Sequence, residues 1–269
     1  MDIKRLTLLG GGTALAGAAA GLLGVSWRAA NMGMYPPEQQ LDDGRFTPDF
    51  YDFPVEEVQY QTEDGVTIDA WWIEGNRPKT VIAVHGFAGR PGTLLPNAQL
   101  LRRTGVNLLL PKLRSSPGPD RHATSFGVNE LKDVIGGVRY VEQRRAPDPA
   151  PGMLLGISMG AATVIMAGAR EPKVLGVIAE APYKDVESII GPPFRRILRL
   201  PSFPFAPITT RIIATREKLD VTEISPLADA KRIAPRPLFV IGDLEDELLD
   251  YHDAIDIYWR GGPRTKLWL

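Results

Sequence analysis

The stretch Met153-Leu154-Leu155-Gly156-Ile157-Ser158-Met159-Gly160-Ala161-Ala162 determines the fold that we predict for this chain. An apolar run, a Gly-x-Ser-x-Gly pentapeptide and an Ala-rich segment follow one another, which predicts a buried strand, a tight turn and a helix. A serine in such a turn, called a nucleophile elbow, is held in a strained conformation at the start of the helix. We therefore take Ser158 as the candidate nucleophile, with Gly156 and Gly160 leaving room where strand and helix nearly collide.

Backbone amides beside this turn are predicted to form an oxyanion hole. Met159, at the start of the helix, would direct its N–H toward a developing oxyanion. A second donor is expected from Phe87, in the loop His85-Gly86-Phe87-Ala88-Gly89. We expect His85 and Gly86 to order this loop, because a histidine there would lie under the oxyanion loop and not opposite the serine. The alternative is a histidine that only caps a strand.

The remaining pattern predicts an α/β protein. Val55–Thr62 and Val66–Glu74 alternate in hydropathy around a Glu-Asp-Gly turn, which predicts an antiparallel hairpin. Short apolar runs then alternate with helical segments, which is typical of a mostly parallel sheet with helices on both faces. We expect about eight strands. The other predicted strands are Thr80–Val84, Val106–Leu110, the run before Ser158, Val174–Ala179, Leu238–Ile241 and Thr265–Leu269, and the predicted helices include Leu94–Arg103, Gly127–Arg144 and His252–Arg260.

Residues 183–221 interrupt this alternation. They hold several prolines and a basic aliphatic patch, Arg195–Leu200. We interpret them as a lid-like insertion that lies over the site and gives it an apolar wall. A loop that packs against a membrane surface is the alternative, and an ordinary connection of this length is uncommon.

The N-terminus predicts export or anchoring. Lys4 and Arg5 precede the uncharged run Leu6–Val25, as in a signal peptide or an N-terminal membrane anchor. Residues 1–30 are therefore assigned to this segment, residues 31–54 to a linker and residues 55–269 to the folded domain. Basic residues before the run place the domain outside the cytoplasm.

Composition excludes several classes of function. The chain of 269 residues has a formal net charge of −1, with charges interspersed, so no nucleic-acid partner is expected. It contains no cysteine, which excludes disulfides, a thiol nucleophile and cysteine-based metal sites. No Gly-x-Gly-x-x-Gly motif follows the first parallel strand, so an oxidoreductase with a dinucleotide is disfavoured. We expect neither a cofactor nor a metal.

From Val55 to Leu269 the chain resembles the α/β-hydrolase superfamily, in particular its serine peptidase- and esterase-like group. The resemblance rests on the His85–Gly89 loop, the Gly156–Gly160 elbow, the segment Ser225–Ala230 and the run Arg236–Gly242 with acids after it. It implies an α/β-hydrolase fold, a Ser–acid–His triad in that order, and hydrolysis of a small-molecule ester or amide through an acyl-enzyme.

The resemblance also indicates the triad acid. That acid is expected three residues after the glycine that ends the penultimate strand, which is Glu245 here. Asp246 and Asp243 are close enough to replace it, and Asp185 is a weaker candidate. Such a carboxylate would hold the histidine in its tautomer. A solvated acidic loop is the alternative interpretation.

The catalytic histidine is the point of departure from the family. It is expected a few residues after the last strand, where the sequence given stops at Leu269, and neither His122 nor His252 occupies that position. Three explanations stay open: the chain is truncated, one of these histidines serves in an altered geometry, or the protein is an inactive relative that binds a ligand or partner. Lys112 is a second departure, at a position where relatives often carry an acid.

Overall fold

The computed structural model describes residues 3–37, 46–145 and 152–269, with side chains from residue 17 onward. Its centre is one eight-stranded sheet with strand order β1-β2-β4-β3-β5-β6-β7-β8. β2 pairs antiparallel with β1 and β4, and all later neighbours are parallel. This confirms the predicted fold class. The strands are β1 Val55–Gln61, β2 Thr67–Ile73, β3 Thr80–Val84, β4 Asn107–Pro111, β5 Met153–Ile157, β6 Val177–Glu180, β7 Leu238–Ile241 and β8 Thr265–Trp268.

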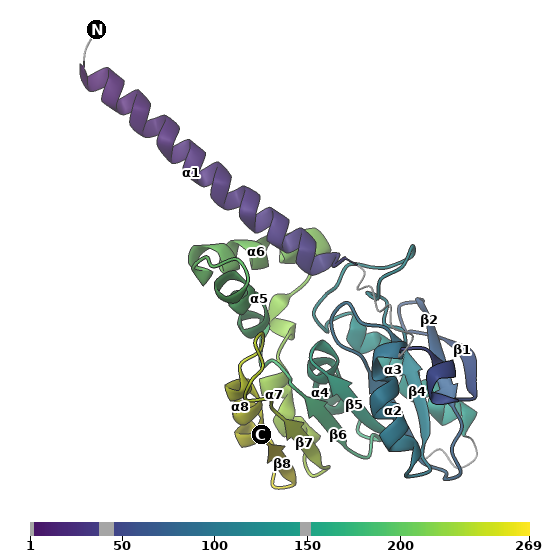
Figure 1. The fold of residues 1–269 in the computed structure, drawn as a ribbon. Coiled ribbons are helices and arrows are strands. Elements are labelled where there is room, and N and C mark those ends of the chain that lie inside the picture. Colours follow the sequence, from purple (N-terminus) through teal and green to yellow (C-terminus); the bar gives the residue numbers. More distant parts are fainter. Residues whose placement is uncertain (1–2, 38–45, 146–151) are drawn as a thin grey trace.

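Helices cover both faces of the sheet (Figure 1). Buried side chains of α3, α4 and α8 form one core with one face, and α2 packs on the other face in a second core. The described helices are α1 Ile3–Met34, α2 Leu95–Arg102, α3 Glu130–Arg144, α4 Met159–Arg170, α5 Val186–Arg196, α6 Ser202–Glu217, α7 Pro226–Ala230 and α8 Tyr251–Arg260.

Packing is uneven across the sheet. Every residue of β3 and β4 is buried, as expected for strands covered on both faces. In β6 and β7 buried residues alternate with half-buried ones, and β8 exposes Lys266 and Trp268. The β8 end of the sheet is therefore covered well on one face only.

The predicted elements agree closely with the observed ones, and the main differences are at β6 and α3. The prediction began β6 at Val174, but it begins at Val177. The prediction began α3 at Gly127, but it begins at Glu130. The buried Glu130 carboxylate accepts hydrogen bonds from the backbone N–H groups of Ser125 and Gly127, at 3.2 and 2.9 Å. These bonds hold the preceding residues in a loop.

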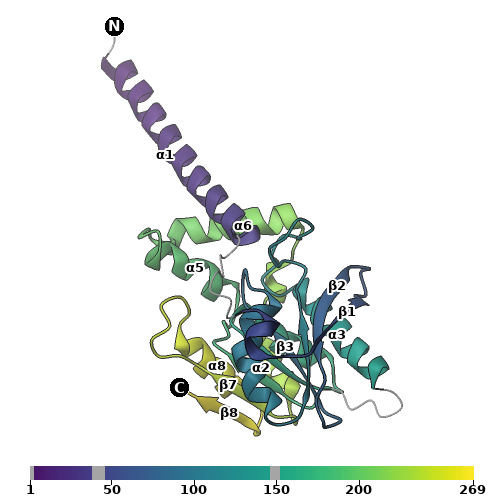
Figure 2. The same ribbon diagram turned by 45° about the vertical axis from the view of Figure 1, so that its right-hand side comes forward.

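The insertion between β6 and β7 consists mainly of α5 and α6, which lie against each other at the end of the sheet nearest α1 (Figure 2). Asp185, the weaker candidate for the triad acid, caps α5 by accepting a 2.9 Å hydrogen bond from the Ser188 N–H. A role as a lid stays a prediction.

The N-terminal segment forms one helix, α1, that continues to Met34, beyond the predicted boundary at residue 30. Its C-terminal part packs on α6, and Ser26, Ala30 and Met34 are fully buried. Among the described residues, no helix meets the length and hydropathy needed to cross a membrane. Part of the predicted linker, residues 38–45, lies outside the described residues.

Candidate active site

Ser158 occupies the turn between β5 and α4 with φ 54° and ψ −118°. A positive φ is uncommon for a residue with a side chain and stores strain at the turn. The Ser158 N–H donates to the carbonyl of Glu180 on β6 at 2.8 Å, and its carbonyl accepts from the Ala162 N–H at 3.2 Å. The turn is therefore tied to the neighbouring strand and to the helix.

The two glycines of the motif permit this turn sterically. A Cβ at Gly156 would lie 2.2 Å from the Gly160 carbonyl oxygen, and a Cβ at Gly160 would lie 2.3 Å from the Val84 carbonyl oxygen. The atoms in the way belong to the backbone, so they cannot rotate aside. Only glycine fits at either position without separating α4 from the strands.

The loop after β3 lies beside the serine. A Cβ at Gly86 would be 3.3 Å from the Ser158 Cβ. Phe87 follows, and its half-buried ring is parallel to that of Phe126 at 6.3 Å between centroids. Within the described residues, the N–H groups of Phe87 and Met159 donate to no other group. Free amides are what an oxyanion hole requires, and that role stays a prediction.

His85 links this loop to the loop after β4. Nδ1 of its buried ring lies 2.9 Å from the Gly86 carbonyl oxygen, and Nε2 accepts a hydrogen bond from the Leu113 N–H at 3.3 Å. The Ser116 hydroxyl lies 2.9 Å from the same Nε2. The proton of the neutral ring is therefore on Nδ1. Burial lowers the pKa of His85 to about 4, so the ring stays uncharged near neutral pH.

We expect His85 to make the protein less stable in mild acid. Its pKa is about 4 in the folded protein and 6.5 for an unperturbed histidine, so between these pH values the unfolded chain binds a proton that the folded protein does not. The contribution of neutral His85 to the free energy of unfolding is complete above the pKa of histidine in the unfolded chain. It falls by about 3 kcal/mol as the pH drops toward the pKa of His85 in the folded protein.

Urea unfolding at about pH 7 and about pH 4 measures this loss, and His85→Gln supplies the control. The variant should show a weaker pH dependence, since every other titrating group is shared. Equal pH dependence in both proteins would contradict the buried neutral imidazole.

The three candidate carboxylates follow β7 but differ in their surroundings. Asp246 is half-buried, and its Oδ1 accepts from the N–H groups of Leu248 and Leu249 at 2.7 and 2.8 Å. Asp243 is exposed and accepts from the Glu245 N–H at 2.9 Å. Asp243 and Asp246 line one small hollow beside the end of β6, and the exposed Glu245 does not.

Neither candidate histidine contacts the serine. His122 is exposed, and its N–H donates to the Arg114 carbonyl. His252 is exposed at the start of α8, where Nδ1 lies 2.7 Å from Asp250 Oδ1. In the described ranges, no histidine hydrogen-bonds the Ser158 hydroxyl.

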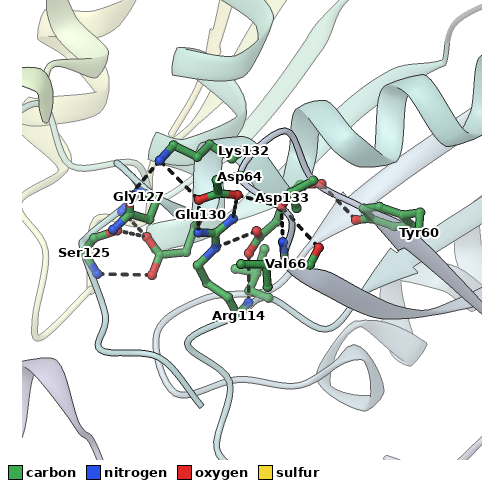
Figure 3. A network of polar contacts seen from close by, with 12 residues as sticks. Tyr60, Asp64, Val66, Arg114, Ser125, Gly127, Glu130, Lys132 and Asp133 are labelled. Carbon is green, nitrogen blue, oxygen red and sulfur yellow. Dashed lines mark hydrogen bonds and ion pairs between the residues drawn. The ribbon is translucent and has the colours of Figure 1, made fainter. Parts of the chain in front are cut away.

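The structure contains a buried polar network that we did not predict from the sequence (Figure 3). Arg114 donates from Nε to the fully buried Asp133 at 2.7 Å, and from both terminal nitrogens to Asp64 of the β1–β2 turn, at 2.7 and 2.9 Å. Burial raises the pKa of Asp133, while Arg114 beside it opposes that rise. The same guanidinium holds the pKa of Asp64 well below its usual range.

This network fixes the β4–α3 loop, and with it the residues that hold His85. Asp133 also accepts from the Arg114 N–H at 2.8 Å, and the Tyr60 hydroxyl donates to the Asp133 carbonyl at 2.9 Å. The only sequence signal for this network was the pair of acidic residues, Glu130 and Asp133, in the first turn of α3.

Comparison with known proteins identifies the family. Residues 81–264 match the model of the alpha/beta hydrolase family. The chain belongs to this family. The alternation of strands and helices and the serine turn after β5 are features on which that fold class was predicted.

The curated relatives are distant. A polyketide transferase, ATR5, of Stachybotrys chlorohalonatus is 27% identical over 48% of this chain and 45% of its own length. The uncharacterized protein YqkD of Bacillus subtilis is 27% identical over 70% of this chain and 62% of its own length. The chain thus spans less than two thirds of either relative.

Among solved structures, the esterase Pf2001 of Pyrococcus furiosus is similar with a TM-score of 0.70 and 23% identity, over 87% of both chains. The alpha/beta hydrolase GrgF of a Penicillium species gives a TM-score of 0.61 and 16% identity, over 80% of this chain and 89% of the other. At these identities the likeness shows the shared fold.

Proposed function

We propose that this protein is a serine hydrolase that cleaves an ester or amide bond through an acyl-enzyme on Ser158. The observation that carries the proposal is the strained Ser158 turn beside Gly86. The N–H groups of Phe87 and Met159 donate to no group in the described part of the chain. The structurally similar Pyrococcus protein is named an esterase, which supports hydrolysis of a small-molecule ester. The rings of Phe87 and Phe126 suit an apolar acyl or leaving group.

The proposed reaction follows the chemistry of serine esterases. A histidine takes the Ser158 proton as Oγ attacks the substrate carbonyl, and the Phe87 and Met159 amides donate to the oxyanion. The protonated histidine then gives its proton to the leaving group as the bond to that group breaks. Water attacks the acyl-enzyme by the same route and releases the acid.

Asp246 is the acid that we assign to this mechanism. Glu245 is exposed and is not among the residues that line the hollow after β6, whereas Asp246 lines it, is half-buried and accepts from two backbone N–H groups. A carboxylate fixed in this way keeps its geometry while it orients a histidine. Asp243 is the second choice, because it lines the same hollow.

Covalent labelling with a fluorophosphonate probe tests the proposal. We expect the protein to be labelled rapidly, and a Ser158→Ala variant to lose labelling entirely. The base is identified with His122→Ala and His252→Ala, since loss of the base should slow labelling by about a hundredfold or more. A folded protein that resists the probe would contradict catalysis by this chain.

The second candidate is a catalytically inactive relative that binds a ligand or partner. It is favoured by one observation: in the described residues, Ser158 has no histidine in hydrogen-bond contact. Absence of labelling in folded protein is the result expected for this candidate.

We also propose that the domain is exported or anchored outside the cytoplasm through its N-terminal segment. The basic residues Lys4 and Arg5 before the uncharged run support this location. Cell fractionation of the full chain checks it, and recovery only in the cytosol would contradict it.

A further inference from the structure

Residues 195–203 comprise the end of α5, the start of α6 and the connection between them, and they present apolar side chains to solvent. We call these residues the insertion tip. Ile197, Leu198 and Phe203 are 66%, 45% and 78% exposed. Large apolar side chains exposed together mark a surface that contacts another molecule or a membrane.

The insertion tip is also strongly basic. Residues 195–203 contain three arginines and no aspartate or glutamate. Arg195 donates to the Ser202 hydroxyl. Arg196 donates to the Asp246 carbonyl, and its charge contributes to the lowered pKa of Asp250. Arg199 pairs with no acid in the described part of the chain. Among the described residues, Arg195 and Arg199 have no acidic partner, so these two positive charges of the tip are not neutralised there.

The helix α1 leaves the domain beside the insertion. The Thr209 hydroxyl of α6 donates to the Ser26 carbonyl at 3.3 Å, and the Arg216 guanidinium lies 5.9 Å from the centre of the Trp27 ring. In both views α1 projects away from the sheet on the side of α5 and α6 (Figures 1 and 2). The uncharged run Leu6–Val25 belongs to this projecting part.

We propose that the insertion tip docks on a lipid bilayer with anionic headgroups. Ile197, Leu198 and Phe203 would enter the boundary between headgroups and acyl chains, while the arginines contact lipid phosphates. A bilayer is the partner that fits both the tip and the uncharged run of α1, because stable attachment at an interface commonly combines an apolar anchor with a basic patch. The proposal does not depend on the chemistry of Ser158.

A fluorescent label on the tip tests this docking directly. The chain has no cysteine, so Leu198→Cys gives a single attachment site for an environment-sensitive dye in the otherwise intact protein. We expect a blue shift and a severalfold rise in emission with vesicles of equal parts phosphatidylcholine and phosphatidylglycerol. Pure phosphatidylcholine vesicles and high salt should weaken the response, since both reduce the electrostatic attraction.

Two further variants distinguish docking by the insertion tip from attachment through α1 alone. A dye at Leu175→Cys, an exposed position between α4 and β6, should show no shift while the protein binds. With the dye at Leu198→Cys, replacing Arg195 and Arg199 together by glutamine should weaken vesicle affinity about tenfold or more. Circular dichroism confirms that these surface variants remain folded.

Three results would overturn the proposal. The protein could fail to bind either kind of vesicle, or bind through α1 without any shift of the tip dye. A shift that depends on protein concentration without vesicles would indicate a second copy of the chain as the partner. Fluorophosphonate labelling of the same samples reports on Ser158 separately.

Discussion

Replacing Gly160 by alanine is expected to destabilise the protein by more than about 3 kcal/mol, enough to leave little folded protein. The added Cβ would lie 2.3 Å from the Val84 carbonyl oxygen and 2.6 Å from the His85 carbonyl oxygen. Both atoms belong to the backbone at the end of β3, where every strand residue is buried. Relief therefore requires α4 to move away from the sheet, and Ser158 moves with it.

Two matched glycines make this prediction specific. Gly168 lies in the same helix, but its Cβ would meet a side-chain atom, Val177 Cγ2, at 2.6 Å, so Gly168→Ala should cause a smaller loss. A Cβ at Gly21, in α1, would have no atom of the described residues within 4 Å. Gly21→Ala should therefore be neutral or stabilising by up to about 1 kcal/mol. Urea unfolding ranks the three variants. Wild-type stability in Gly160→Ala would contradict the contact of α4 with β3.

Arg114→Met is expected to destabilise the protein by about 3–5 kcal/mol. The substitution keeps most of the buried side-chain volume but removes the charge that lies 2.7 Å from the fully buried Asp133 and 2.7 Å from Asp64. Asp133 would keep only the backbone N–H of residue 114 as a donor to its carboxylate. An uncompensated buried charge is expensive, and a single backbone donor does not replace the guanidinium.

The pH dependence of this loss has a defined sign. Burial raises the folded pKa of Asp133 to about 7 even with Arg114 present, and without Arg114 this pKa rises further. Below about pH 7 both folded proteins hold the Asp133 proton, so the deficit should be smallest there and grow as the pH increases above about 7. Urea unfolding of Arg114→Met across this range measures it.

The control is Arg139→Met, which breaks an exposed 3.5 Å ion pair with Glu63 and should change stability by less than about 1 kcal/mol. The double variant Arg114→Met/Asp133→Leu should regain part of the loss, because no buried charge is left unpaired. Equal effects of Arg114→Met and Arg139→Met would contradict the buried network.

Local patterns predicted the sheet and the serine turn because their determinants are contiguous in sequence. The runs Thr80–Val84 and Leu238–Ile241 match β3 and β7 residue for residue. The turn at Ser158 was predicted from the local spacing of the two glycines, although the atoms that a Cβ at Gly160 would meet belong to Val84 and His85 at the end of β3. A run that alternates in hydropathy or is fully apolar, and that is bounded by turn residues, predicts a strand without reference to distant residues.

The polar interior was not predictable in the same way. Asp64, Arg114 and Asp133 come from a hairpin turn, a loop and a helix, and each reads as an ordinary surface charge within its own segment. The triad acid was ambiguous for another reason. One loop holds three candidate acids, Asp243, Glu245 and Asp246. Hydrogen bonds from backbone N–H groups to Asp243 and Asp246 set the conformation of this loop, in which Asp246 is half-buried and Glu245 is exposed.

The uneven packing of the sheet separates the site into two regions of different local stability. Ser158 is attached to β5, next to the fully buried β3, whereas the carboxylates of residues 243–246 follow β7, beside the short and partly exposed β8. Partial unfolding begins where few apolar contacts oppose it, so warming should loosen the β8 end first. Under the proposed mechanism, the carboxylates would then lose their position relative to Ser158 while most of the sheet is intact, so activity would be lost at a temperature below the melting temperature of the domain.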